Sequence, residues 1–300
     1  MTLRDKVSLL AAAAIFSNVL AATQEEQTLA SARAPHQVYA GAGAKVKVHR
    51  ARLDGYFMSQ AGSDAMVARL KKDVAKCLAS NRPASGLKHT VDWPTYAISA
   101  RVDEYMAANR SIRYQSGVAY VMHPADCGLI GEITSTATLT SARGICQIDL
   151  VKKIAEGDCD SSGHANAPIP KRPAMSADET IRKMAANPAM AAAAAQMKAM
   201  REFQPIRTDE YRNVLWARCD VWRQKLQGSN DTATFCYASG ASFVAAGAPE
   251  DGGPGSLQLD IDNPQGFRQK AVDVKFDTEV SSAVFTPYNG AGFSIKKRAP

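Results

Sequence analysis

The densest group of side chains able to do chemistry lies in one short stretch, His123-Pro124-Ala125-Asp126-Cys127. A histidine and an aspartate in one loop can relay a proton or bind a metal ion. The same stretch is typical of a turn between two strands, in which proline and aspartate set the backbone and the cysteine forms a disulfide. We favour the turn, and we keep His123 and Asp126 as the first candidates for catalytic residues.

A second group of carboxylates near the C-terminus could converge on a sheet, where paired carboxylates can do acid–base work or bind calcium. We favour a solvent-exposed face, because Asp260 and Asp262 alternate with apolar residues. The group consists of Asp260, Asp262, Asp273 and Asp277. Their spacing is not that of an EF-hand loop. The segment 240 to 244 (GASFV) lacks the closing glycine of a nucleophile elbow, and no Walker loop, dinucleotide fingerprint or H-E-x-x-H motif is present. The sequence therefore predicts no cofactor and no metal, and it favours a protein without catalytic activity.

An alanine-rich pair of helices is predicted over residues 176 to 203, a segment that is also rich in methionine. Flexible thioethers beside small alanine side chains suit a surface that adapts to apolar partners. The alternative is an ordinary helical hairpin that covers a sheet. The candidate binding residues here are Met190, Met197 and Met200, which share one helix face.

A basic strand is predicted where Lys45, Lys47 and His49 alternate with valines. The chain carries a formal net charge of +7, which weakly favours anionic surfaces. We therefore add Lys45 and Lys47 to the candidate binding residues, with a protein or an anionic envelope component as the expected partner. Nucleic acid is not expected, because no dense basic stripe or known binding module is present.

The first 22 residues have the layout of a cleavable secretory signal. Two cations precede an apolar run from Val7 to Ala22, which is shorter than the roughly 20 residues that a membrane-spanning helix needs. Cleavage near Ala22 is expected, and a small-residue site near Ala32 is the alternative. The sequence thus predicts a periplasmic or secreted protein that does not span the membrane after cleavage.

Six cysteines follow the signal, and this even number indicates three disulfides, with buried free thiols as the alternative. None forms a C-x-x-C pair, so a redox centre of the thioredoxin type is not expected. A predicted helix over 209 to 226, lying on the next strand, brings Cys219 to Cys236. The other four cysteines allow three pairings. We favour Cys146 with Cys159, and Cys77 with Cys127.

Several predicted elements must position these groups. The first is a helix that begins at Ser63, with a buried stripe of apolar residues that ends at Cys77. Segments rich in Ile, Val, Thr and Tyr follow it, and their connections are too short for crossover helices, which predicts antiparallel neighbours. These segments are 96 to 103, 112 to 122, 129 to 140 and 145 to 151. Further short strands are expected between residues 232 and 295.

The chain is expected to be α+β, with two small antiparallel-sheet domains and packing helices. Residues 157 to 173 contain three prolines and few apolar side chains, and we interpret them as a linker. The expected domains are 33 to 156 and 209 to 300, with the linker and the Ala/Met helical hairpin in 157 to 208. The leading hypothesis is an exported, disulfide-bonded, non-catalytic binding or assembly factor of the cell envelope. The alternative is an exported hydrolase whose site is assembled from distant residues.

Overall fold

The computed structural model describes residues 22 to 80, 92 to 141, 144 to 159, 177 to 201, 203 to 239, 256 to 264 and 267 to 296. The predicted signal up to residue 21 lies outside these ranges. So do most of the predicted linker, from residue 160 onward, and the GASFV segment.

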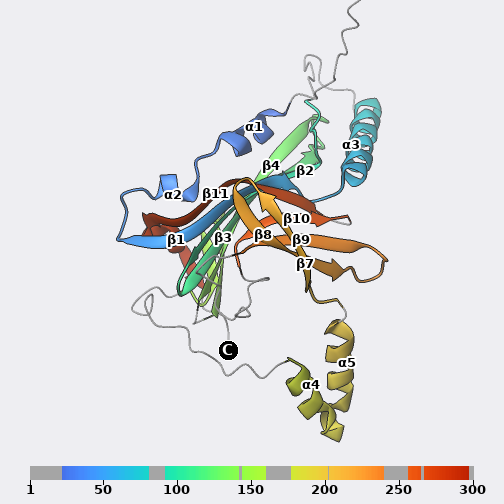
Figure 1. Cartoon of the computed structure of the whole chain (residues 1–300). Coiled ribbons are helices and arrows are strands. Elements are labelled where there is room, and N and C mark those ends of the chain that lie inside the picture. The colour runs from blue at the N-terminus through green and yellow to red at the C-terminus, as the bar shows by residue number, and fades with distance from the viewer. Residues whose placement is uncertain are drawn as a thin grey trace, which may run out of the picture.

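A single sheet of twelve strands organises the described chain (Figure 1). Its order is β12-β6-β5-β4-β3-β2-β1-β11-β10-β9-β8-β7. The prediction of two separate sheets is wrong, because β1 (Lys45–Tyr56) pairs along its whole length with β11 (Phe267–Ser281). This pairing joins the N-terminal meander to the strands β7 to β11.

The N-terminal strands form the antiparallel meander that the sequence predicts, because each short connection returns the chain beside the strand that it leaves. After β1 they are β2 (Ile98–Ala107), β3 (Arg110–Met122), β4 (Leu129–Ser141), β5 (Gly144–Asp149) and β6 (Ile154–Gly157).

The C-terminal part contains more strand than predicted. Its strands are β7 (Ile206–Val214), β8 (Ala217–Lys225), β9 (Thr232–Ala238), β10 (Gln258–Asn263), β11 and β12 (Ser294–Lys296), the last of which pairs in parallel with β6. The prediction of a helix over 209 to 226 is wrong, because this stretch forms the β7–β8 hairpin. In β8, Ala217, Cys219 and Val221 are buried with the period of two that a strand gives.

Six helical segments precede β7 in the described ranges. They are α1 (Gln24–Ser31), α2 (Pro35–Val38), α3 (Gln60–Ser80), α4 (Ala177–Ala185), η1 (Pro188–Met190) and α5 (Ala191–Arg201). Two 3₁₀ turns, η2 (Ser282–Phe285) and η3 (Pro287–Asn289), replace a strand predicted over 284 to 288. Within the described ranges, no helix combines the length and apolarity needed to cross a membrane.

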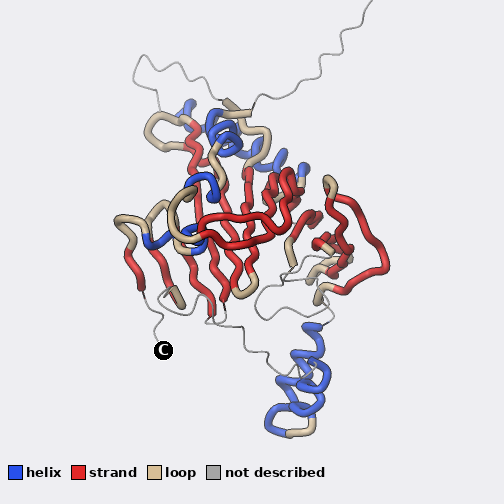
Figure 2. Tube along the Cα trace, turned by 60° about the vertical axis from the view of Figure 1, so that its left-hand side comes forward, coloured by secondary structure: helices blue, strands red, loops and turns tan. Residues whose placement is uncertain are grey.

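Two apolar cores lie on opposite faces of the central strands. Tyr105 belongs to one core and its neighbour Met106 to the other, as alternation along β2 requires. The first core packs under the 3₁₀ turns through Val284 and Phe285. The second lies where the sheet curls, so that β8, β9 and β10 pack over β1 and β2 (Figure 2).

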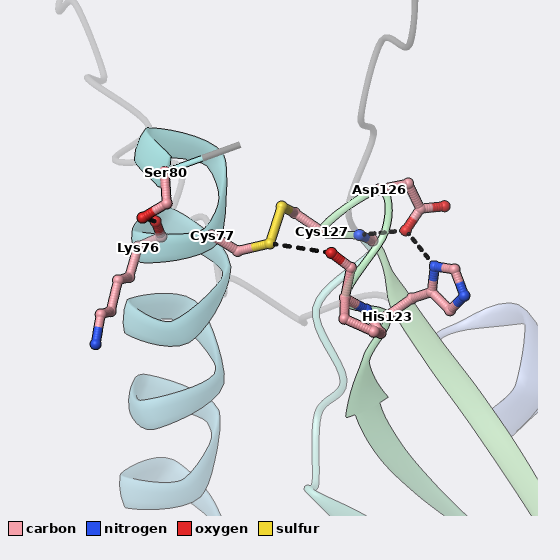
Figure 3. Close-up of a disulfide and its surroundings, with 8 residues drawn as sticks. Lys76, Cys77, Ser80, His123, Asp126 and Cys127 are labelled. Atoms are coloured by element: carbon pink, nitrogen blue, oxygen red, sulfur yellow. Dashed lines mark hydrogen bonds and ion pairs between the residues drawn. A yellow bond between two sulfur atoms is a disulfide. The ribbon is translucent and has the colours of Figure 1, made fainter. Parts of the chain in front are cut away.

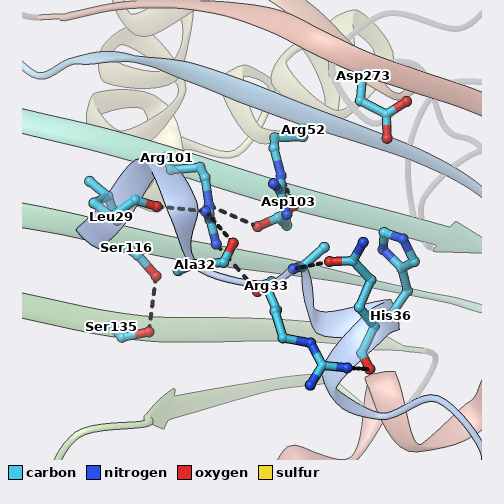
Figure 4. Close-up of polar contacts among 12 residues, drawn as sticks. Leu29, Ala32, Arg33, His36, Arg52, Arg101, Asp103, Ser116, Ser135 and Asp273 are labelled. Atoms are coloured by element: carbon cyan, nitrogen blue, oxygen red, sulfur yellow. Dashed lines mark hydrogen bonds and ion pairs between the residues drawn. The ribbon is translucent and has the colours of Figure 1, made fainter. Parts of the chain in front are cut away.

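A buried arginine holds the N-terminal segment on the sheet (Figure 4). The guanidinium of Arg101 on β2 donates to the carbonyl of Leu29 at 2.7 Å and to that of Ala32 at 2.8 Å. Its Nε lies 3.3 Å from the carboxylate of Asp103, which also accepts from Arg52 at 2.8 Å. The side chains of Arg101 and Asp103 are only 6% and 7% exposed, so this charge pair is part of the interior.

Three disulfides are present, Cys77–Cys127, Cys146–Cys159 and Cys219–Cys236. These are the pairs that the sequence favoured. Cys219 and Cys236 meet across the neighbouring strands β8 and β9, not through the expected helix. Disulfides form and persist in oxidising compartments, and three of them agree with an extracytoplasmic protein.

A buried histidine on β1 makes the stability of the fold depend on pH. His49 is 1% exposed, and its Nδ1 accepts a hydrogen bond from the backbone N–H of Asp277 at 3.1 Å. Loss of solvation lowers the pKa of His49, although Asp277 opposes this shift. The unfolded chain therefore takes up the proton at a higher pH than the folded chain does. This contribution to stability is complete above about pH 6.5, the pKa of an unperturbed histidine, and is lost as the pH falls.

We expect the free energy of unfolding to decrease between pH 7.5 and pH 5, and a His49→Asn variant to show a smaller decrease. Urea unfolding at four pH values measures both slopes. The stability of the variant should still depend on pH to some extent, because the pKa of His36 is also lowered. Burial is the main cause of that shift, and the charge of Arg50 is the second. Equal slopes in the variant and the parent would contradict the assignment to His49.

Candidate binding groove

An open groove of about 530 Å³ lies between α3 and the end of β3. This volume falls within the range of small-ligand sites. Its lining residues are Leu70, Asp73, Lys76, Cys77, Ser80, Tyr120, Val121 and Met122. We call it the α3–β3 groove.

The groove exists because β2 is shorter than β3. The first residue of β2, Ile98, pairs with Ala119, whereas β4 pairs with β3 as far as Met122. The last three residues of β3 therefore have a strand partner on one side, and α3 lies on the other. Leu70 packs against the small core of Leu29, Val118 and Tyr120, and this contact anchors the helix.

The lining combines apolar groups with charges of both signs. Val121 is 40% exposed and pairs across the strands with Ile130, which is 42% exposed. Asp73 and Lys76 supply one carboxylate and one ammonium group from α3. A ligand with apolar side chains and a charged group would therefore match the lining.

The loop after β3 holds the two catalytic candidates (Figure 3). His123 Nδ1 lies 2.9 Å from Asp126 Oδ1, and the same oxygen accepts from the N–H of Gly128 at 2.9 Å. The Gly128 N–H, and then the His123 contact, lower the pKa of Asp126. The loop is also closed by a bond from the N–H of Cys127 to the carbonyl of His123. These contacts are those of a strand-to-strand turn.

The position of the His123–Asp126 pair does not favour catalysis in the groove. Neither residue lines the groove, and Figure 3 shows both side chains on the side of the loop away from α3. In the described part of the chain, no serine, threonine or cysteine side chain is hydrogen-bonded to His123. A nucleophile for this pair is therefore missing from the described residues.

The methionine candidates lie on the outer part of the helical hairpin. Met190, Met197 and Met200 are 41%, 37% and 61% exposed. Figures 1 and 2 both show α4 and α5 extending away from the sheet, so this hairpin does not cover it. Its role in binding remains a prediction.

The lysine candidates face an acidic residue on the neighbouring strand. Lys45 Nζ lies 3.6 Å from Glu279 Oε2, and Lys47 is opposite Glu279 in the β1–β11 register. Part of the positive charge predicted for this strand is therefore offset locally. Binding of an anionic component by Lys45 and Lys47 remains a prediction.

The carboxylates near the C-terminus do not converge. Asp262 lies 3.8 Å from Arg268, Asp273 is paired with Arg50, and Asp260 is opposite Lys270 in the register. Among the residues that the structure describes, no group of three or more His, Cys, Asp or Glu could hold a metal ion.

Sequence reasoning missed the groove, because its two walls are about fifty residues apart along the chain. One signal was available. Cys77 lies near the end of the predicted helix, and its favoured partner Cys127 follows the 112 to 122 strand, so the disulfide alone places the helix end beside the strand end.

No family model matches the chain, and no curated protein matches it. Solved structures of PNGF-II in the C2 and P21 space groups are distantly similar, with TM-scores of 0.33 and 0.37 and identities of 6% and 8%. Each match covers 84% of this chain and 31% or 32% of the PNGF-II chain, so this chain spans about a third of their length. Similarity at this level carries no argument about function.

Proposed function

We propose that the protein is an exported, disulfide-bonded binding or assembly factor that holds an extended segment of a partner protein in the α3–β3 groove. The observation that carries the proposal is the end of β3, where three residues extend beyond β2 into an open groove. A strand edge presents backbone N–H and C=O groups that an added strand can pair with.

The lining also selects the kind of segment that would bind. An extended chain turns alternate side chains to opposite sides. One set of its apolar residues would therefore contact Leu70 and Tyr120, which lie on one face of β3, and the other set would contact Val121. Asp73 and Lys76 would pair with charged residues at its ends. We therefore expect a partner segment that alternates apolar and polar residues and carries charge.

Fluorescence polarisation with a panel of labelled ten-residue peptides, alternating valine with threonine or lysine, tests the proposal. We expect a Val121→Glu variant to bind the best peptide at least tenfold more weakly, a loss of about 1.4 kcal/mol. The matched control is Val272→Glu, because Val272 is a 51% exposed strand residue outside the groove lining. This control should bind within twofold of the parent.

The contribution of the strand edge is tested by methylating alternate backbone nitrogens of the same peptide. The methylated peptide keeps its side chains but cannot donate the ladder hydrogen bonds, so its binding should be lost. Equal binding of both peptides, or equal effects of Val121→Glu and Val272→Glu, would contradict the proposal.

The second candidate function is the exported hydrolase, and the 2.9 Å contact between His123 and Asp126 is the observation that favours it. The same peptides distinguish the two candidates when they are examined by mass spectrometry after incubation. Cleavage that disappears in a His123→Gln variant would favour the hydrolase. Intact peptides would favour the binding factor.

A further inference from the structure

One of the three disulfides contains a cysteine that is not fully buried. Cys146, Cys159, Cys219 and Cys236 are each at most 1% exposed, and Cys127 is 2% exposed. Cys77 is only half-buried, and it lines the α3–β3 groove. Thiol–disulfide exchange needs direct access of a thiolate to one sulfur of the bond. Cys77, the least buried of the six cysteines, is therefore the favoured point of attack.

The surroundings of Cys77 also suit an incoming thiolate. Lys76 also lines the groove, so its ammonium group adds positive charge to the groove, although Figure 3 shows this side chain pointing away from the disulfide. Figure 3 shows the disulfide bridging α3 and the 123–127 loop, with Cys127 on the loop side. An anionic nucleophile entering the groove therefore meets Cys77 before Cys127.

We propose that Cys77–Cys127 is a thiol–disulfide exchange site, which an external dithiol attacks at Cys77 Sγ. The attacking thiolate forms a new S–S bond to Cys77 as the Cys77–Cys127 bond breaks, and the electron pair leaves on Cys127, which takes a proton from water. The second thiol of the dithiol then displaces Cys77, which is protonated in turn. The pair gains two electrons and two protons, and the dithiol becomes a disulfide.

Reduction at this site releases one end of α3. The start of the helix stays attached, because Ser63 Oγ accepts a hydrogen bond from the N–H of Ala97 at 2.8 Å. The loop also keeps its own bonds, from the N–H of His123 to the carbonyl of Gly128 at 2.8 Å and from the N–H of Cys127 to the carbonyl of His123 at 2.9 Å. The exchange therefore frees the groove-lining end of α3 without opening the sheet.

Differential alkylation of the native, fully oxidised chain tests the assignment. With limiting dithiothreitol and no denaturant, iodoacetamide should label Cys77 and Cys127 while the other four cysteines stay protected. With 2-mercaptoethanol, mass spectrometry should find the mixed disulfide on Cys77. Earlier or equal reduction of either other disulfide, or an adduct mainly on Cys127, would overturn the proposal.

Two charge-reversal variants test whether the attacking thiolate approaches through the groove. Lys76→Glu should slow the reaction with the anionic thiol 3-mercaptopropionate about fivefold more than the reaction with neutral 2-mercaptoethanol, at low salt. The matched control is Lys72→Glu, because Lys72 is an exposed residue of α3 that does not line the groove. Equal effects of the two substitutions would overturn the proposed route of attack. Neither outcome depends on whether a peptide binds in the groove.

Discussion

Replacing Arg101 with methionine should lower the free energy of unfolding by about 3 to 5 kcal/mol, the usual cost of removing one partner of a buried charge pair. Two carbonyls, those of Leu29 and Ala32, lose their donor. Asp103, which is 7% exposed, keeps only its bond from Arg52. The N-terminal segment loses its bonds to Arg101 but keeps the contacts of Glu26 with Ser99 and of His36 with Tyr105 on β2.

Urea unfolding of the oxidised protein measures the loss. The control is Arg207→Met, which breaks a 2.7 Å contact with Asp220 in which the arginine side chain is 49% exposed. Exposed pairs contribute at most about 1 kcal/mol, so this variant should stay close to the parent. Arg101→Lys should recover part of the loss, because it restores the charge but not the planar group that reaches the two carbonyls through Nη1 and Asp103 through Nε. A loss below 1 kcal/mol in Arg101→Met would contradict the role given to this residue.

Replacing both Cys219 and Cys236 with alanine should cost at least about 3 kcal/mol. The two cysteines are 17 residues apart, and the chain-entropy model gives roughly 3 kcal/mol for a loop of about this length. Both side chains are also buried in the core between the curled parts of the sheet, so their truncation leaves a cavity that adds to the loss.

Thermal and urea unfolding of the double variant measure this effect. A second variant, Cys219→Val with Cys236→Val, restores apolar volume without the covalent link. It should recover the part of the loss that comes from packing, and the remainder is the contribution of the link. A double-alanine variant within 1 kcal/mol of the parent would contradict the expected contribution of this disulfide.

The sequence by itself determined the elements whose residues follow one clear period. The helix predicted from Ser63 is present as α3, which begins three residues earlier, at Gln60. Its apolar stripe is only partly buried, because Val74 is buried whereas Cys77 is half-buried. The strands between residues 98 and 149 are separated by short connections. These connections are too short for the crossover that parallel neighbours need, so the strands pair antiparallel. The apolar residues from 209 to 226 fit the period of a helix and also that of a strand. We predicted a helix from this pattern, and the prediction is wrong.

Tertiary structure decided how the strands combine and where the groove lies. The pairing of β1 with β11 joins residues more than two hundred positions apart. It is made by backbone hydrogen bonds, and the backbone N–H and C=O groups do not depend on the type of side chain. The pairing therefore leaves no signal in the linear sequence. The groove likewise depends on the offset by which β3 extends beyond β2, and on α3 lying beside the three residues of β3 that β2 does not reach. Local periodicity reports which face of an element is buried, whereas the partner that buries it is chosen by packing among distant segments.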